Sequence, residues 1–468
     1  MTSPAPDRRP THPTRIGILL FAFAFAVMAD PVSSVAYAIE AALRSLGGRL
    51  DLLLVTMVVV LGIIAVVCAN YDQLIRRFPA GGGAVAATGA AFGEGWAFLP
   101  LGALIVDFVL TIAISVAAAS SAAIAYVPEL APHRTTIAVA LCCLVAGLTW
   151  FGHIGRSVFA AMTVLFIGSA IVVVWLGWGA APAAGGGAPP IAGAGGPWAV
   201  ILAFPVAMAL ATGVEAPASA IAQLGQLDDR GRIRSGRLTL WLTFAITSSL
   251  TLLLAGLAVR LGEGASAHGT LLANVARAAA GGGGWFAAFQ ATSALLLLAA
   301  ASSSFQAGPG LLKALSREAG AGVLPPALGR TNRHHTPTAS VIVFLAMSLA
   351  VVIAARGREQ ELVLFYAVSV FISFLCGLLA MARISIRDRA RVLVVVNVVG
   401  ALAVAFTLLV NLRRGYPIAS VAASLLIAGA LARAWIRQGR PRGIAQAERT
   451  MELEVAPGPV VGDPEDRV

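Results

Sequence analysis

The sequence predicts an all-α membrane protein with about twelve transmembrane helices, and three observations carry this prediction. Hydrophobic residues make up 58% of the 468 residues and charged residues only 12%. The mean hydropathy is +0.86, and one soluble core cannot bury so much apolar surface, so lipid must cover most of it. The apolar residues also fall in runs of roughly 18 to 30, each long enough to cross about 30 Å of hydrocarbon as an α-helix.

The net charge of +11 is explained better by membrane topology than by a nucleic-acid partner. The basic residues form short clusters between apolar runs, such as 230–237 and 383–391, and never an extended stripe. With the N-terminus inside, about 24 of the 33 Lys and Arg residues lie on the cytoplasmic side, which is the bias that orients helical membrane proteins. We therefore expect a multi-pass protein of the plasma membrane with both termini cytoplasmic and with no nucleic-acid partner.

The order of the elements follows from hydropathy and from turn and charge breaks. Residues 1–15 are predicted to form a cytoplasmic N-terminal tail, and the apolar stretch after them has no signal-peptide cleavage pattern, so it is a retained first span. The tail at 438–468 is rich in Arg, Glu, Pro and Gly and is predicted to be disordered and cytoplasmic. Between the tails we expect twelve spans, near 16–46, 50–77, 96–126, 135–152, 156–178, 198–222, 238–262, 285–315, 338–355, 361–383, 390–411 and 417–437.

The first and sixth spans contain residues that interrupt a helix. Pro31 follows an acidic residue in the first span, while Gly213 and Pro217 flank another in the sixth. Breaks at matching positions of two five-helix halves are typical of inverted-repeat transporters, whose substrate lies between the breaks. We therefore expect repeat one at about 16–178, repeat two at about 198–383 and two extra helices at about 390–437. The alternative is that Gly and Pro here only kink or pack membrane helices.

Three acidic residues lie deep in these spans: Asp30 at the first break, Asp107 in the third span and Glu215 at the second break. A carboxylate at a helix centre costs about 2.5–3.5 kcal/mol on insertion scales, so each needs a partner, a proton or a bound cation. The alternative is a hydrogen-bonded or permanently protonated acid that holds helices together. Glu40, nearer the end of the first span, is predicted to pair with Arg44 at i+4.

Oxygen-bearing side chains accompany these acids. Asp107, Thr111 and Ser115 recur every four residues and line one helical face, although the hydroxyls could instead bond their own backbone carbonyls. Tyr37 lies two turns beyond the first break, and Thr212 lies at the second. Carboxylate, hydroxyl and carbonyl oxygens are the ligands that hard cations prefer. The sequence therefore predicts a positively charged cargo.

Five segments together resemble the KUP-type potassium-uptake permeases of the amino acid-polyamine-organocation (APC) superfamily: ADPVSSVAYAIE at 29–40, FPAGGGAVAATGAAFG at 78–93, LIVDFVLTIAISVAA at 104–118, ATGVEAPASAI at 211–221 and LFYAVSVFISF at 364–374. The resemblance implies a LeuT-like fold with ten core helices in two inverted repeats and two peripheral helices. It also implies uptake of potassium coupled to protons by alternating access, with Glu215 as the candidate for proton coupling. The potassium ligands that it implies are Asp30, Tyr37, Asp107, Thr111, Ser115, Thr212 and Tyr366.

No cofactor is expected, and no nucleophile, metal cluster or P-loop accompanies the buried acids, so an enzyme is disfavoured. The expected partners are potassium ions, protons and the bilayer, and a homodimer is left open. Many KUP-type members carry a large cytoplasmic domain after the last helix, and we expect none here, which puts regulation through such a domain in doubt.

The main rival function is an amino acid or small-amine permease of the same fold. Amino acid permeases have a Gly-rich first break whose bare amides face a substrate carboxylate, whereas Asp30-Pro31 places a negative charge there. A small organic cation would tolerate that charge and could stack on Tyr37, Phe108 or Tyr366. A channel is a further alternative, but the sequence has no filter-like repeat such as T-V-G-Y-G.

Overall fold

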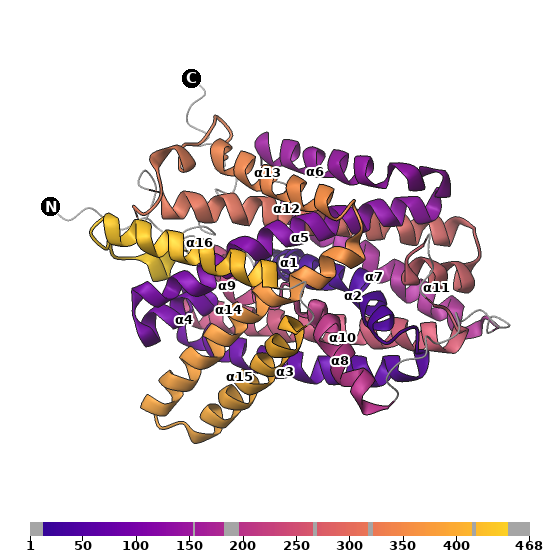
Figure 1. Ribbon diagram of the computed structural model, residues 1–468, viewed down its shortest axis with the longest axis horizontal. Coiled ribbons are helices and arrows are strands. Elements are labelled where there is room, and N and C mark those ends of the chain that lie inside the picture. The colour runs from indigo at the N-terminus through magenta and orange to yellow at the C-terminus, as the bar shows by residue number, and fades with distance from the viewer. Residues whose placement is uncertain are drawn as a thin grey trace.

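The computed structural model describes residues 13–152, 155–181, 196–264, 269–316, 322–413 and 418–447. The helices in these ranges are α1 (Pro13–Val27), α2 (Ala29–Ser45), α3 (Leu53–Arg77), α4 (Gly83–Phe92), α5 (Phe98–Tyr126), α6 (Arg134–Trp150), α7 (Arg156–Gly179), α8 (Pro197–Ala207), α9 (Ala216–Ala220), α10 (Asp229–Leu261), α11 (Leu271–Ala280), α12 (Gly284–Leu315), α13 (Thr338–Ala354), α14 (Glu359–Arg387), α15 (Arg391–Leu412) and α16 (Ile418–Arg437). They pack as one bundle (Figure 1).

The spans predicted from hydropathy agree with the helices. Within the described ranges, eleven helical stretches are long and apolar enough to cross a membrane, with α1–α2 and α8–α9 each counted as one stretch. The predicted span at 338–355 corresponds to α13, which is apolar but has only 17 residues. An all-α membrane protein is therefore confirmed.

Hydropathy located the seventh span well at its end but not at its start. The prediction begins at 238, whereas α10 begins at Asp229. Asp228 caps this helix, since its Oδ1 accepts a hydrogen bond from the Gly231 amide at 2.9 Å. A side-chain cap of this kind starts a helix irrespective of hydropathy, and arginines are good helix formers. The arginine cluster predicted as a loop therefore lies on the first turns of α10.

Two short helices, α4 and α11, fall in segments predicted as connections. Each has ten residues, fewer than a membrane span needs. The Thr270 side chain caps α11 by accepting a hydrogen bond from the Ala273 amide at 3.1 Å. Short helices of this kind escape a search for membrane spans because that search looks for long apolar runs.

Helix α5 forms the centre of the bundle (Figure 1). It packs against α6, α12, α13, α14 and α16. Of its most apolar stretch of 18 residues, 94% is buried inside the protein. Its sequence is rich in Ala and contains three Ser, and small residues let neighbouring helices approach closely. A polar side chain on α5 therefore faces protein rather than lipid, which makes this helix a suitable place for a buried acid.

The two predicted breaks differ in form. At the first, α1 ends at Val27 and α2 begins at Ala29, and the helical hydrogen bonds of Met28 continue on both sides. At the second, α8 gives way to a 3₁₀ turn at Met208–Ala211 and then to non-helical backbone before α9. The first break is thus a narrow interruption at a proline, which lacks the N–H that would bond the Val27 carbonyl, while the second is a wide one.

Candidate functional site

The two breaks are in contact with each other at Gly213. This residue has φ +71°, and a Cβ added to it would lie 2.7 Å from Pro31 Cδ and 2.8 Å from Asp30 Oδ2. Glycine adopts a positive φ without steric cost and has no Cβ. Only glycine therefore fits here without displacing the first break, and the second break lies directly against the Asp30 carboxylate.

A serine that the sequence reasoning did not select strengthens this contact. The Ser34 hydroxyl lies within 2.6 Å of the Pro31 carbonyl oxygen and 3.2 Å of the Leu210 carbonyl oxygen, which belongs to the second break. The neighbouring Ser33 donates to the Asp30 carbonyl oxygen at 2.7 Å. Hydroxyls commonly satisfy carbonyls that a proline or an unwound turn leaves without a partner. Two serines that follow an intramembrane proline after one intervening residue were the signal for this role.

Asp30 and Asp107 form the acidic part of the site. Asp107 is buried on α5, with 6% of its surface exposed. The two carboxylates lie close enough to interact electrostatically. Asp30 Oδ1 is buried and has no hydrogen-bond partner among the described residues. Two acids that face each other in apolar surroundings repel when both are ionised, so the arrangement favours a bound cation or a proton.

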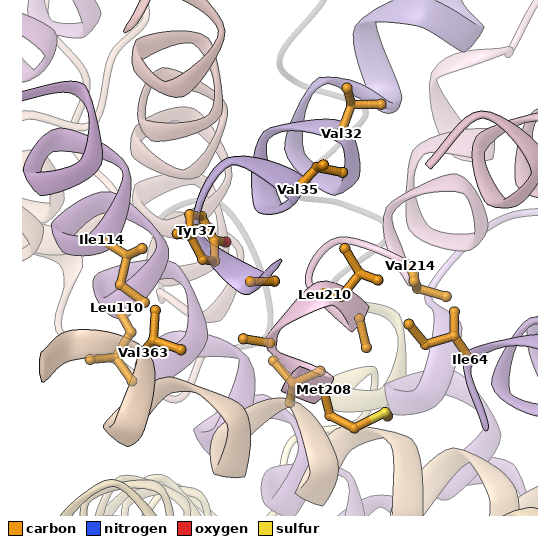
Figure 2. Packing of buried hydrophobic residues seen from close by; sticks show 14 of the residues in the cluster. Val32, Val35, Tyr37, Ile64, Leu110, Ile114, Met208, Leu210, Val214 and Val363 are labelled. Atoms are coloured by element: carbon orange, nitrogen blue, oxygen red, sulfur yellow. The ribbon is translucent and has the colours of Figure 1, made fainter. Parts of the chain in front are cut away.

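Tyr37 and Thr212 complete the surroundings of Asp30. The Tyr37 side chain lies close to the Thr212 side chain and within electrostatic reach of both acids. Thr212 Oγ1 also donates to the Ala209 carbonyl oxygen at 2.6 Å. Figure 2 shows the ring of Tyr37 on α2 beside the apolar side chains of Leu110 and Ile114 of α5. The structure thus joins α2, α5 and the second break around one polar centre within an apolar core.

The remaining oxygen stripe continues along α5. Thr111 and Ser115 are buried, with 2% and 1% of their surfaces exposed. Ser115 Oγ has no hydrogen-bond partner in the described parts of the chain. Eight residues of α-helix separate it from Asp107, which is about 12 Å along the axis. The stripe is therefore too long to form a single coordination shell.

Glu215 lies on the α3 side of the second break. The Tyr71 hydroxyl of α3 donates to Glu215 Oε2 at 3.3 Å, and Tyr71 itself is buried. Sequence reasoning did not select Tyr71, because a tyrosine in an apolar span is ordinary without knowledge of what it faces. Glu215 is half-buried, and this hydrogen bond brings its carboxylate into contact with α3. Tyr366 belongs to α14, but its side chain lies outside the described residues.

The end of α2 that lies away from the breaks is closed by a second set of polar contacts. The predicted pair is confirmed, since Glu40 Oε1 lies 2.7 Å from an Arg44 nitrogen. Glu40 Oε2 also accepts a hydrogen bond from the Leu271 amide, at the start of α11, at 2.8 Å. Nearby, Glu359 Oε2 of α14 accepts from the Ser121 hydroxyl of α5 at 2.6 Å. These contacts join α2, α11, α14 and α5 at one end of the bundle.

Comparisons with known proteins add a family and a fold. A family model described as "Amino acid permease" matches residues 18–430. The potassium transporter KimA of Bacillus subtilis (strain 168) is 26% identical over 358 residues, which make up 74% of this chain and 58% of that protein. The chain therefore spans less than two thirds of the length of this relative.

Solved structures of a manganese transporter from Eremococcus coleocola are similar in fold. One, of a variant, aligns with a TM-score of 0.50 and 15% identity over 93% of this chain and 98% of that chain. Another, in complex with an aromatic bis-isothiourea substituted compound, has a TM-score of 0.49 and 15% identity over 93% and 97% of the two chains. The first likeness shows the fold, which is the LeuT-like arrangement of membrane helices.

Proposed function

The chain belongs to the amino acid permease family, and from this premise we propose that it takes up potassium ions together with protons by alternating access. The family places the chain among the secondary transporters of the APC superfamily and not among enzymes. The potassium cargo and the proton coupling are our proposal. The relative from Bacillus subtilis, whose name states that it transports potassium, supports it.

One observation carries the cation cargo. The Asp30 carboxylate lies against the second break, within electrostatic reach of Asp107, and its Oδ1 is buried without a hydrogen-bond partner among the described residues. A carboxylate oxygen left in this state costs free energy that a dehydrated cation would recover. The surrounding oxygens of Tyr37 and Thr212 are hard ligands. The site therefore suits an alkali cation better than a zwitterion.

The potassium ion also has to lose its hydration shell to enter the site. In our proposal the two carboxylates replace part of the hydration shell, and the hydroxyls of Tyr37, Thr212, Thr111 and Ser115 replace more of it. Because the last two lie further along α5, the ion passes from the acidic pair to the stripe as the protein changes state. Tyr366 remains a proposed ligand on the strength of the family resemblance.

We assign proton coupling to Glu215. Its hydrogen bond from Tyr71 ties it to α3, and in our proposal it gains or loses a proton without removing a cation ligand. A change in its charge beside the second break alters the electrostatic free energy of a cation bound nearby. The proton gradient is thereby linked to the cargo through a neighbouring group.

The test is flux in proteoliposomes. Replacing Asp30 by asparagine (D30N) keeps the size of the side chain but removes the charge, so potassium or rubidium uptake should fall at least about 10-fold while the protein still inserts. D51N is the matched control, because Asp51 is an exposed acid paired with Arg49 at 2.6 Å, and it should transport like the wild type. Wild-type uptake by D30N would remove this acid from the mechanism.

Coupling needs a separate measurement. E215Q should still bind and exchange potassium when no proton gradient is applied, but an inward proton gradient should no longer accelerate its uptake. Equal stimulation of E215Q and wild type by the gradient would overturn the assignment of Glu215.

The family description favours an amino acid or amine as the second candidate cargo. The same proteoliposomes distinguish this cargo from potassium, since the uptake of a panel of amino acids and small amines can be measured alongside potassium uptake. If the protein transported an amine in a manner that depends on Asp30 and transported no potassium, the cargo would be an organic cation instead of potassium. Transport of a zwitterionic amino acid would contradict the argument that the negative charge of Asp30 at the first break disfavours a substrate carboxylate.

We further propose that the protein lies in the plasma membrane with both termini cytoplasmic, on the strength of the Lys and Arg distribution. Gly225 and Gly282 lie in exposed positions that accept a side chain, with nothing within 4 Å of an added Cβ. A membrane-impermeant thiol reagent should label G282C in intact cells and G225C only after permeabilisation. The reverse pattern would invert the topology.

A further inference from the structure

A cavity of about 420 Å³ lies on the outer face of α10, away from the transport site. It is lined by Arg230, Ile233, Arg234, Arg237, Leu238 and Trp241. The arginines and the tryptophan recur at spacings of four, three and four residues, which places them on one side of the helix. The cavity is therefore a feature of one helix face with a basic end and an apolar end.

The position of this cavity along α10 matches the boundary of a membrane. From Leu238 to Val259 the helix has 22 residues without a charged side chain, which is about 33 Å and close to the thickness of the hydrocarbon layer. Arg230, Arg234 and Arg237 precede this run. They therefore lie at headgroup depth, while Leu238 and Trp241 lie where acyl chains begin, as interfacial tryptophans do.

The charges at the cavity are only partly paired within the protein. Arg237 Nε lies 2.6 Å from Asp72 Oδ1, and Arg76 lies 2.8 Å from the other oxygen of the same carboxylate. Trp241 Nε1 also donates to Asp72 Oδ1, at 3.3 Å. By contrast, Arg230 and Arg234 are exposed and form no ion pair with any of the described residues. Asp72 is thus shared by Arg237 and Arg76, and Asp229 pairs with Arg232, which leaves Arg230 and Arg234 for a ligand.

We propose that this cavity binds one anionic phospholipid, with the phosphate held by Arg230, Arg234 and Arg237 and the first part of an acyl chain lying on Leu238 and Trp241. Guanidinium groups bind phosphate oxygens in a bidentate manner. Ile233 and Leu238 offer apolar surface beside them, and Leu238 is 66% exposed. A soluble phosphate would use the arginines but not this apolar end, so the combination fits a lipid.

The proposal has a structural consequence for α10. Asp72 belongs to α3, and the pair with Arg237 joins α3 to α10. The arginines of α10 lie together on one face only while the protein is folded, so a lipid bound there favours the folded state. An anionic lipid should therefore raise the thermal stability of the protein as well as bind to it.

Native mass spectrometry of the purified full chain tests the proposal, with phosphatidylglycerol and phosphatidylcholine of identical acyl chains as probes. The wild type should bind one phosphatidylglycerol in preference to phosphatidylcholine. In R230Q/R234Q this preference should fall about 30-fold, since each arginine near a membrane surface contributes about 1 kcal/mol to binding an anionic lipid. R230K/R234K keeps both charges and should retain most of the preference.

R387Q/R391Q is the matched control. Arg387 and Arg391 are exposed arginines at the junction of α14 and α15, outside the cavity, and their replacement removes the same charge. This control should bind phosphatidylglycerol like the wild type. An equal loss in both double variants, or no loss in R230Q/R234Q, would overturn the proposal.

Thermal unfolding in detergent separates a lipid from a soluble phosphate. Phosphatidylglycerol should raise the unfolding temperature of the wild type and of R387Q/R391Q but not of R230Q/R234Q. Glycerol phosphate, which has the headgroup chemistry without acyl chains, should leave all three unchanged. Equal stabilisation by glycerol phosphate would assign the cavity to a soluble anion and would overturn the lipid.

Discussion

Replacing Gly213 by alanine tests the contact between the two breaks. The added Cβ would lie 2.7 Å from Pro31 Cδ and 2.8 Å from Asp30 Oδ2, closer than real Cβ atoms approach. The backbone is also at φ +71°, which costs a residue with a side chain about 1–2 kcal/mol. Relief of the overlap requires the breaks to separate by roughly 0.5–1 Å.

The two costs give the expected magnitude. Overpacking of a tight site costs about 1–3 kcal/mol, so together with the backbone term G213A should lose about 2–5 kcal/mol of stability. The displacement falls on Asp30, which we propose as a potassium ligand. Uptake should therefore fall at least about 10-fold, which corresponds to about 1.4 kcal/mol, in protein that still reaches the membrane.

The assay pairs potassium uptake in proteoliposomes with thermal unfolding in detergent. G256A is the control, because Gly256 lies within α10 and nothing lies within 4 Å of its added Cβ. Alanine should stabilise that helix by about 0.5–1 kcal/mol and leave uptake unchanged. If G213A unfolds and transports like the wild type, the breaks do not depend on their close approach, and the reasoning from Gly213 is refuted.

Three further substitutions test other contacts. E40Q weakens the hold of α2 on the start of α11, so hydrogen exchange of the first α11 amides should rise about 10-fold; wild-type exchange would show that Glu40 does not hold this helix. Asn397 of α15 is hydrogen-bonded to Asn70 and Gln73 of α3, so N397L should leave these buried partners unsatisfied at about 1–3 kcal/mol each, and an unchanged unfolding temperature would contradict this. G308A places a Cβ against the buried ring of Phe344 and should lower the unfolding temperature by the equivalent of about 1–3 kcal/mol, unless the ring can shift without cost.

The sequence predicted the number and order of the helices because lipid imposes a simple rule on them. Each span must be apolar and about 20 residues long, and hydropathy reads this rule directly. The start of α10 was missed because a capping aspartate, Asp228, extends that helix beyond its apolar part. Short helices such as α11 obey no such length rule, so only tertiary contacts reveal them.

The candidate site was predictable in its acids but not in its connections. An intramembrane carboxylate such as Asp30 stands out in any sequence because of its cost. Its contact with Gly213 depends on how two distant segments meet, and no local pattern encodes this. The same holds for Tyr71, which becomes notable only through its hydrogen bond with Glu215.

Helix α15 is one of the two helices predicted to be peripheral, yet side-chain amides tie it to α3, which lies in the predicted first repeat. Asn397 Oδ1 accepts from Asn70 Nδ2 at 2.9 Å, and Asn397 Nδ2 donates to Gln73 Oε1 at 2.8 Å. Sliding α15 along α3 by one turn, about 5.4 Å, would break both bonds between these buried side chains. We therefore expect α3 and α15 to move as one rigid unit during any transport cycle. Spin labels on α3 and α15 should report a constant separation, and that distance can serve as a reference for measuring the movements of other helices.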